Sequence, residues 1–342
     1  MKKSLILLLS LGLMAFAVTG CGGNDDQGQT DDQQQQQTEA ASYTWGSASL
    51  GSNGYVIIEA FVSTINKTDI DFVNASVSTG GGAENMALLG RNEIQFGQAM
   101  SSDMSNAKHG IAPYDGVIEF NQILGYQWSE LPIVVFEDSD IQTPDQLAGK
   151  RVAVGPASGA AAFVSNILFT ELGLIDDVEF VYGSWSECAD LLKVGQADAV
   201  VNFHINGALV TSVFAELYET KPMRPISVDT AILEKMAAEN DGLVVSSTKA
   251  GAYPAYKEAH PCIGLTAVLV CQPGIPEDHV YTVTKTIMEN MEGLIEMAPV
   301  QLTGFSQEMA LDTLVKGYPI HPGAAKYYKE AGLWRDDMVM AE

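Results

Sequence analysis

Basic residues are scarce in this sequence. Its 342 residues include 18 Lys and Arg against 43 Asp and Glu, so the formal net charge is −25. A nucleic-acid-binding protein needs a basic face, and this charge excludes that class. Apolar residues make up 46% of the chain, which is enough for an ample core, and the length allows two domains. The chain is an acidic globular protein, and its charge raises the question of whether it can bind an anion.

Cysteine is also scarce, and no spacing of Cys and His resembles a zinc site. Apart from Cys21, the cysteines are Cys188, Cys262 and Cys271. Residues 263–270 form a β-branched apolar run typical of a buried strand, whose ends would lie roughly 25–30 Å apart. A disulfide between Cys262 and Cys271 is therefore not expected. We interpret Cys188, Cys262 and Cys271 as small buried apolar residues.

The sequence lacks an apolar run long enough to span a membrane as a mature helix. Residues 5–18 are apolar, follow two lysines and lead into Thr19-Gly20-Cys21, which predicts an export signal over 1–20. The end of this segment resembles a bacterial lipobox, in which cleavage precedes the cysteine and its sulfur receives a diacylglycerol. We expect Cys21 to anchor the protein on the outer side of the cell membrane. The alternative is an ordinary signal peptide in which Cys21 is incidental.

Residues 22–42 contain five acids, seven Gln and no Lys or Arg. Such a segment cannot bury enough apolar surface to fold. We predict that 21–42 form a disordered tether of roughly 25 Å, and that the folded body starts near Tyr43.

From Tyr43 onward, predicted strands alternate with predicted helices. Short apolar runs predict strands, and apolar residues at three-or-four spacing predict helices. The predicted strands are 43–48, 72–78, 94–100, 119–125, 131–136, 151–154, 178–182, 198–203, 225–228 and 263–270. The predicted helices run through 55–65, 86–89, 143–147, 159–172, 186–194 and 277–297.

This alternation predicts an α/β fold with parallel sheets covered by helices. Two apolar strands, 131–136 and 263–270, bracket the middle third of the chain. That arrangement is expected if the chain leaves one lobe, builds a second and returns through crossing hinge strands. We predict lobe 1 from 43–132 plus 262–342, and lobe 2 from 133–261.

Three glycine-rich turns each precede a predicted helix: Gly46–Tyr55, Thr79–Asn85 and Gly155–Gly159. Each places free backbone N–H groups and a Ser or Thr hydroxyl at a helix N-terminus, which favours an anion by about 0.3–1 kcal/mol, or about 2 when partly buried. Taken singly, each is also explained as a tight turn with an N-cap. Three turns that follow strands in both lobes favour one shared site beyond the carboxyl ends of the strands.

Known cofactor and nucleophile motifs are absent. The sequence has no G-x-x-x-x-G-K-[ST], no G-x-G-x-x-G with an acid about twenty residues later, and no G-x-S-x-G between a strand and a helix. We therefore predict no cofactor, no metal and no catalytic residue. A hydrolase-like enzyme or a ligand-sensing lipoprotein on the same fold is the alternative.

Three stretches carry a family resemblance: LAGKRVAVGPASG (147–159), GQADAVV (195–201) and PIHPGAAKYYKEAG (319–332). With the export signal and the turns, they resemble the TAXI group of solute-binding proteins, which serve TRAP transporters. The resemblance covers about 43–335. It implies a two-lobed, type II periplasmic-binding-protein-like fold that closes around a small carboxylate and delivers it to a membrane subunit. The carboxylate would be glutamate, a related amino acid or a dicarboxylate. The alternative is a binding protein of another transporter class for a different small anion.

The chain departs from the usual residues of that family in three places. Gly82 stands where the family's T-G-G-S-x-E-N has Ser. The first turn keeps Tyr55 but reads S-N-G-Y-V, and Ser101-Ser102-Asp103 corresponds to the family's Q-S-D.

The turns and the resemblance together predict the ligand contacts. They are Ser49, Ser52 and Tyr55 from the first turn, Thr79, Gly82 and Asn85 from the second, Ser158 and Gly159 from the third, Ser101 at a strand end, and Asn202 and His204 from lobe 2. For His204, a surface or core role is the alternative, and so is core packing for Trp45, Trp128 and Trp185. All four arginines lie away from the turns, so a carboxylate would depend on helix N-termini and hydroxyls: Arg91, Arg151, Arg224 and Arg335.

Overall fold

The computed structural model describes residues 40–50, 52–157 and 159–342. The predicted signal peptide, the predicted lipidation site at Cys21, the predicted tether as far as residue 39, Gly51 and Ser158 lie outside the described residues. Within the described part, no helix is both long and apolar enough to cross a membrane.

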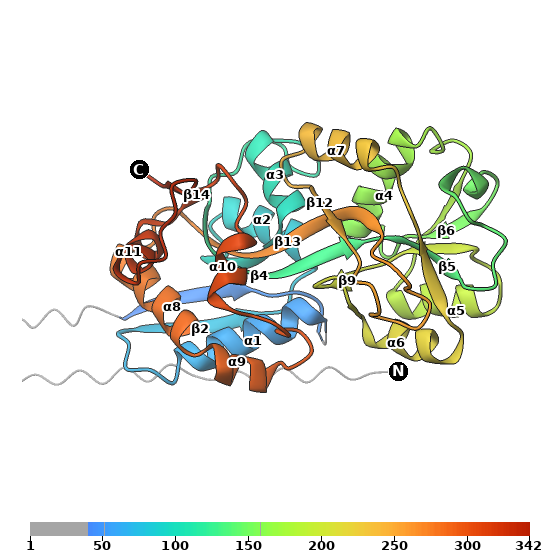
Figure 1. The fold of residues 1–342 in the computed structure, drawn as a ribbon. Helices are drawn as coiled ribbons and strands as arrows, with labels where there is room; N and C mark the ends of the chain where they lie inside the picture. The colour runs from blue at the N-terminus through green and yellow to red at the C-terminus, as the bar shows by residue number, and fades with distance from the viewer. Residues whose placement is uncertain (1–39, 51, 158) are drawn as a thin grey trace, which may run out of the picture. The chain divides into compact units, whose positions relative to one another are not determined.

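Lobe 1 is built on three parallel strands in the order β3-β1-β2, and β3 continues through antiparallel β13 to β4. The strands are β1 (Ala41–Gly46), β2 (Phe72–Val77), β3 (Phe96–Met100), β4 (Asn121–Leu131) and β13 (Pro261–Cys271). Helices α1 (Asn53–Ile65), α8 (Glu277–Glu289) and α9 (Met291–Met297) lie along one face of this sheet, and α2 (Gly82–Gly90) and α3 (Ser101–His109) along the other (Figure 1). The C-terminal part adds α10 (Gln307–Asp312), β14 (Pro319–Ile320), α11 (Pro322–Glu330) and β15 (Val339–Met340).

Lobe 2 is built on a second sheet in the order β11-β5-β8-β6-β7, in which β6 is parallel to β7 and β8, and β5 is antiparallel to β8 and β11. Its strands are β5 (Ile133–Phe136), β6 (Arg151–Ala153), β7 (Glu179–Val181), β8 (Ala199–Val201) and β11 (Met223–Ile226). Its helices are the 3₁₀ turn η1 (Pro144–Leu147), α4 (Ala160–Glu171), α5 (Trp185–Lys193), α6 (Ser212–Thr220) and α7 (Thr230–Glu239).

Alternation along β5 shows how the lobe 2 sheet is buried. Ile133 and Val135 pack with Leu168 of α4, whereas Val134 and Phe136 pack with Phe214 of α6. Successive strand residues point to opposite faces, so a continuous apolar strand needs helices on both sides. The mixed α/β prediction for the fold is confirmed.

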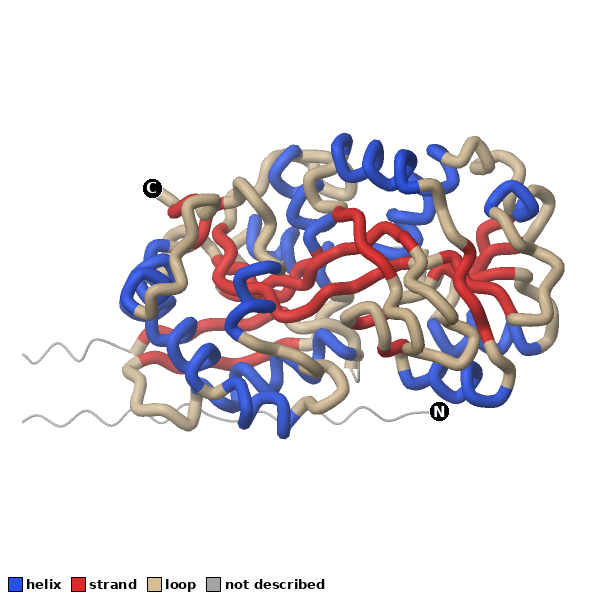
Figure 2. The backbone as a smooth tube through the Cα atoms, viewed as in Figure 1, coloured by secondary structure: helices blue, strands red, loops and turns tan. Residues whose placement is uncertain are grey.

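The long strands β4 and β13 pair along their lengths and connect the two lobes, and we call this pair the β4–β13 ribbon (Figures 1 and 2). At its lobe 2 end, the ribbon is widened by three short strands, β9 (His204–Ile205), β10 (Leu209–Val210) and β12 (Val244–Ser247). The sequence predicted separate strands at 119–125 and 131–136. In the structure, β4 continues to Leu131 and ends at Pro132, which has no backbone N–H to pair.

The predicted single helix over 277–297 is wrong, because the chain forms two helices that meet at Asn290. The Asn290 side chain donates a hydrogen bond to the carbonyl of Thr286 at 2.7 Å. Asn is a poor residue for a helix interior because its side chain competes for backbone groups. Cys188, Cys262 and Cys271 are buried and free, as predicted.

Candidate functional site

A cavity of about 380 Å³ lies between the two lobes, on one side of the β4–β13 ribbon. The first residues of six helices line it. They are the cap Ser52 with Asn53 and Gly54 at α1, Gly82 and Ala83 at α2, Asp103 at α3, the cap Gly159 with Ala160 at α4, Trp185 at α5, and the cap Thr211 with Val213 at α6. Helix N-termini carry unpaired N–H groups and partial positive charge, so this wall attracts an anion without any cationic side chain.

The first and third turns reach the cavity through their helix caps. Ser52 caps α1 by accepting a hydrogen bond from the N–H of Tyr55 at 3.4 Å, and Gly159 is the cap of α4. Both line the cavity. Ser49 is exposed and Tyr55 is half-buried, and neither lines it.

In the second turn, Thr79 and Asn85 are occupied within the protein. The Thr79 hydroxyl donates to Asn85 Oδ1 at 2.7 Å, and Asn85 Nδ2 donates to the carbonyls of Gly46, Ser47 and Gln98 at 2.8–3.1 Å. Asn85 is fully buried. The predicted ligand contacts at Thr79 and Asn85 therefore hold the first turn, the second turn and β3 together, and neither side chain lines the cavity.

The start of α3 contributes Asp103, which the sequence analysis did not select. Its Oδ2 accepts a hydrogen bond from the N–H of Met100 at 3.2 Å, a helix-capping contact, while the side chain faces the cavity. Ser101, which was selected, points away from this cavity. Its hydroxyl donates to the carbonyl of Gly242 at 2.5 Å and accepts from the N–H of Thr266 at 3.0 Å.

Among the described residues that line the cavity, Asp103 is the one acid, and there is no Glu, Lys, Arg or His. Burial raises the pKa of Asp103 to about 7, and the hydrogen bond from Met100 opposes that rise. None of the four arginines lines this cavity, and each contacts other groups of the protein. Arg91 pairs with Glu93, Arg151 with Asp198 and Arg335 with Asp312, and Arg224 donates to the carbonyls of Ser139 and Ile141.

Asn202 and His204 lie behind the cavity wall, and the intervening Phe203 lines the cavity instead. His204 is fully buried, stacks on Tyr256 and lies 2.6 Å from its hydroxyl through Nε2. Burial lowers the pKa of His204 to about 4. Successive side chains of an extended segment point to opposite sides. Phe203 therefore faces the cavity, whereas the predicted contacts Asn202 and His204 face the interior of lobe 2.

Several polar residues of the cavity escaped the sequence analysis. Tyr126 donates from its hydroxyl to Gln98 Oε1 at 3.3 Å, and Gln127 Nε2 donates to Ser129 Oγ at 2.8 Å. Thr211 Oγ1 is buried and has no hydrogen-bond partner within the described ranges. Tyr126, Gln127 and Ser129 belong to the stretch of β4 that the sequence did not predict as a strand.

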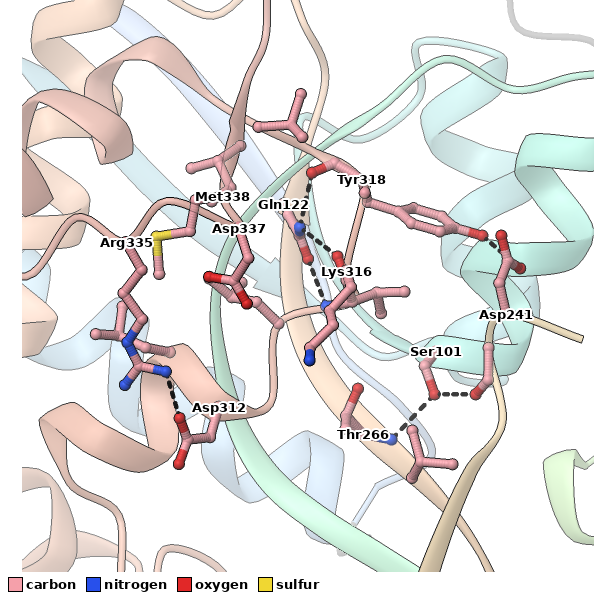
Figure 3. A pocket seen from close by; sticks show the side chains of 18 of the residues that line it. Ser101, Gln122, Asp241, Thr266, Asp312, Lys316, Tyr318, Arg335, Asp337 and Met338 are labelled. Atoms are coloured by element: carbon pink, nitrogen blue, oxygen red, sulfur yellow. Dashed lines mark hydrogen bonds and ion pairs between the residues drawn. The ribbon is translucent and has the colours of Figure 1, made fainter. Parts of the chain in front are cut away.

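A larger cavity, of about 590 Å³, lies on the opposite face of the β4–β13 ribbon. We call it the rear cavity. Successive side chains of β13 point to opposite faces of the ribbon, so Thr266 lines the rear cavity and Ala267 lines the cavity between the lobes. Figure 3 shows the wall of this rear cavity, where Asp241 accepts from the hydroxyl of Tyr318 at 2.9 Å. The Ser105 hydroxyl donates to the same Asp241 oxygen at 2.5 Å. The C-terminal segment and the α7–β12 connection enclose it, and no helix N-terminus of the described chain other than that of α3 reaches it. The cavity between the lobes is therefore the stronger candidate for a ligand site.

A solved structure of a solute-binding protein shares this architecture. A TctC solute-binding protein from Polaromonas aligns with a TM-score of 0.50 at 14% identity, over 78% of this chain and 89% of that chain. A putative L-cystine ABC transporter protein from Listeria monocytogenes aligns with a TM-score of 0.45 at 16% identity, over 78% and 98%. The alkanesulfonate-binding protein SsuA from Xanthomonas axonopodis pv. citri, bound to MOPS, gives 0.44 at 14% identity, over 89% and 99%. The similarity to the Polaromonas structure, at 14% identity, is one of fold.

A family match covers most of the described chain. Residues 45–332 match the NMT1-like family, a span that includes both lobes, the three turns and Asp103. The predicted type II periplasmic-binding-protein-like fold agrees with that match and with the Polaromonas structure. The chain therefore belongs to the NMT1-like family.

Proposed function

We propose that the protein is the extracytoplasmic solute-binding receptor of a TRAP transporter of the TAXI type. It captures a small carboxylate, such as glutamate, a related amino acid or a dicarboxylate, and delivers it to the membrane subunit. The observation that carries this proposal is the convergence of six helix N-termini on one cavity between the lobes. Its volume of about 380 Å³ falls within the range of small-molecule sites, roughly 300–1,000 Å³.

Ligand capture would work through closure of the lobes. A ligand that touches α1 and α2 from lobe 1 and α4 from lobe 2 binds the closed arrangement more tightly and shifts the population toward it. The β4–β13 ribbon is the hinge in this proposal. The lipidated Cys21 would keep the receptor at the membrane, beside the subunit that accepts the solute.

The proposal is tested by thermal-shift measurements with amino acids and dicarboxylates. A ligand at 100 times its Kd stabilises the protein by about 2.7 kcal/mol, which raises Tm measurably. Ala160→Trp, which fills the cavity at the start of α4, should abolish the shift. Ala231→Trp makes the same change at an exposed position in the first turn of α7 and should preserve it.

Two results would overturn the receptor proposal. One is the absence of a Tm shift with every small carboxylate for the unmodified protein. The other is chemical conversion of a bound carboxylate, detected by NMR of the incubation mixture, since a receptor returns its ligand unchanged and an enzyme does not.

A further inference from the structure

The starts of α2 and α3 touch in the cavity wall, and the contact depends on a glycine. A Cβ at Gly82 would overlap Asp103 Oδ2 and would lie 3.0 Å from the backbone nitrogen of Met100 and 3.2 Å from the Cα of Ala99. Any side chain at position 82 would therefore displace the Asp103 carboxylate from its present position. Gly82 and Asp103 form a coupled pair, in which the glycine makes room for the acid.

Within the protein, Asp103 has little to satisfy its charge. Its Oδ2 accepts one backbone hydrogen bond, from Met100, and its Oδ1 has no partner among the described residues. Burial raises the pKa of Tyr114, and the nearby Asp103 carboxylate raises it further. Burial also raises the pKa of Tyr126, which lines the same cavity, so both tyrosines are uncharged near neutral pH. Glu84 does not line the cavity, and its carboxylate accepts from the N–H of Gly80 at 2.5 Å.

This arrangement gives the cavity two electrostatic characters. The N-termini of α1 and α4 present backbone N–H groups to a negative group, whereas Asp103 presents a carboxylate oxygen to a positive one. A charge in such an enclosed site is stable only when it is paired. A dicarboxylate would place two anions beside Asp103 without any cation to balance them.

We propose that Asp103, given its position by Gly82, is the subsite for a protonated amine, and that the ligand is a zwitterionic amino acid. The ammonium donates to the free oxygen of Asp103, and the carboxylate accepts from helix N-termini. This inference rests on the proposed receptor function and sharpens it, because it separates amino acids from dicarboxylates.

The test compares probes that differ only at the amine. L-Glutamate is compared with 2-hydroxyglutarate and glutarate, and L-leucine with 2-hydroxy-4-methylpentanoate, by isothermal titration calorimetry at pH 8. For the pair that binds, loss of the ammonium should weaken binding by about 10- to 100-fold, the value of a hydrogen bond to a charged group. Asp103→Asn should remove that discrimination while keeping a group that can cap α3.

Gly82→Ala tests the coupling. It should weaken amino-acid binding toward the level of Asp103→Asn, and the double variant should bind no worse than either single variant, because both act on one contact. Asp176→Asn removes an exposed acid in lobe 2 and should leave the discrimination unchanged.

The possible failures are distinguishable. Binding of glutarate or 2-hydroxyglutarate as tight as that of L-glutamate keeps the receptor proposal and overturns the amine subsite. Amino-acid discrimination that survives Asp103→Asn in a variant with a normal unfolding transition also overturns it. If none of the carboxylates binds, the receptor proposal fails, and the amine subsite fails with it.

Discussion

Two aspartates lie on opposite faces of the β4–β13 ribbon and differ in what surrounds them. Asp241, at the rear cavity, accepts hydrogen bonds from Ser105, His109 and Tyr318. Burial acts to raise the pKa of Asp241, but these three donors outweigh it and the pKa is lowered. Asp103, at the cavity between the lobes, has one backbone donor, and burial raises its pKa to about 7.

The difference shows that position near a cavity does not by itself identify a binding group. Asp241 ties α3 and the C-terminal segment to the α7–β12 connection, so its charge serves the fold. Asp103 has acceptor capacity that the described protein does not use. Ionisation of a buried carboxylate with few donors, such as Asp103, lowers the stability of the folded protein. A cationic ligand that pairs with the carboxylate offsets this loss.

The largest effect should come from Asp241→Ala. It removes the acceptor of the Ser105 and Tyr318 hydroxyls, but the Asp241 side chain is 41% exposed and water can replace part of this contact. We therefore expect the free energy of unfolding to fall by about 2 kcal/mol in urea denaturation at pH 7. Asp241→Asn keeps part of the acceptor and should cost less. A loss below about 0.5 kcal/mol for Asp241→Ala would remove the contrast between the two aspartates.

Affinity for an amino acid should depend on pH through Asp103. Only the ionised carboxylate accepts the ammonium, so the association constant should fall below pH 7, approaching tenfold per pH unit, and level off above it. Titration calorimetry from pH 5 to 8 measures this. Asp103→Asn should bind weakly at every pH, and a pH slope that persists in this variant would assign the titration to another group.

Asp103→Asn should also stabilise the protein without ligand. The folded pKa of about 7 lies above the unfolded value of 3.8, so the folded state binds more protons between these values, and stability falls as pH rises through that window. The cost is absent below about pH 4 and complete above pH 7. We expect a gain of about 1–2 kcal/mol at pH 8, reduced by solvent in the cavity, and almost none at pH 4. A lower Tm at pH 8 would contradict this account.

The smallest effects should come from two buried threonine hydroxyls, one on each side of the ribbon. Thr211 Oγ1 and Thr266 Oγ1 both lack hydrogen-bond partners among the described residues. Thr266→Val at the rear cavity should raise the free energy of unfolding by up to about 1 kcal/mol and leave ligand affinity unchanged. Thr211→Val should stabilise similarly but weaken binding several-fold. Equal affinities in the two variants would show that Thr211 does not serve the site.

The sequence predicted the strands and turns that are encoded locally. The Gly81 backbone has φ 111°, which glycine adopts readily, and the Ser52 cap is a short-range contact. It did not predict α3, whose SSDMSNAKH carries no apolar stripe, because that helix depends on packing against α2 and β13. The centre of the lobe 2 sheet was predictable because β5 and β8 are apolar and buried along their whole lengths.

Site residues were harder to predict than elements. Gly82 and Gly159 do line the cavity, but Asn85 looked like a ligand contact until its three backbone acceptors were known. Asp103 and Ser101 both lie at the start of α3, but Asp103 lines the cavity between the lobes and Ser101 lines the rear cavity. Which cavity each side chain faces depends on how α3 packs against β13. Such facing is a tertiary property that residue spacing alone does not determine.

The position of Trp185 has a practical consequence. Its indole lies against Gly155, where a Cβ would overlap the ring, and it contacts Phe203 in the wall between the lobes. Trp45, by contrast, is fully buried and stacked on Phe96. A solute that reaches the cavity would change the surroundings of Trp185 and not those of Trp45. Ligand binding can therefore be followed by the intrinsic fluorescence of Trp185, with no added dye. The ligand-induced fluorescence change should be lost in Trp185→Phe.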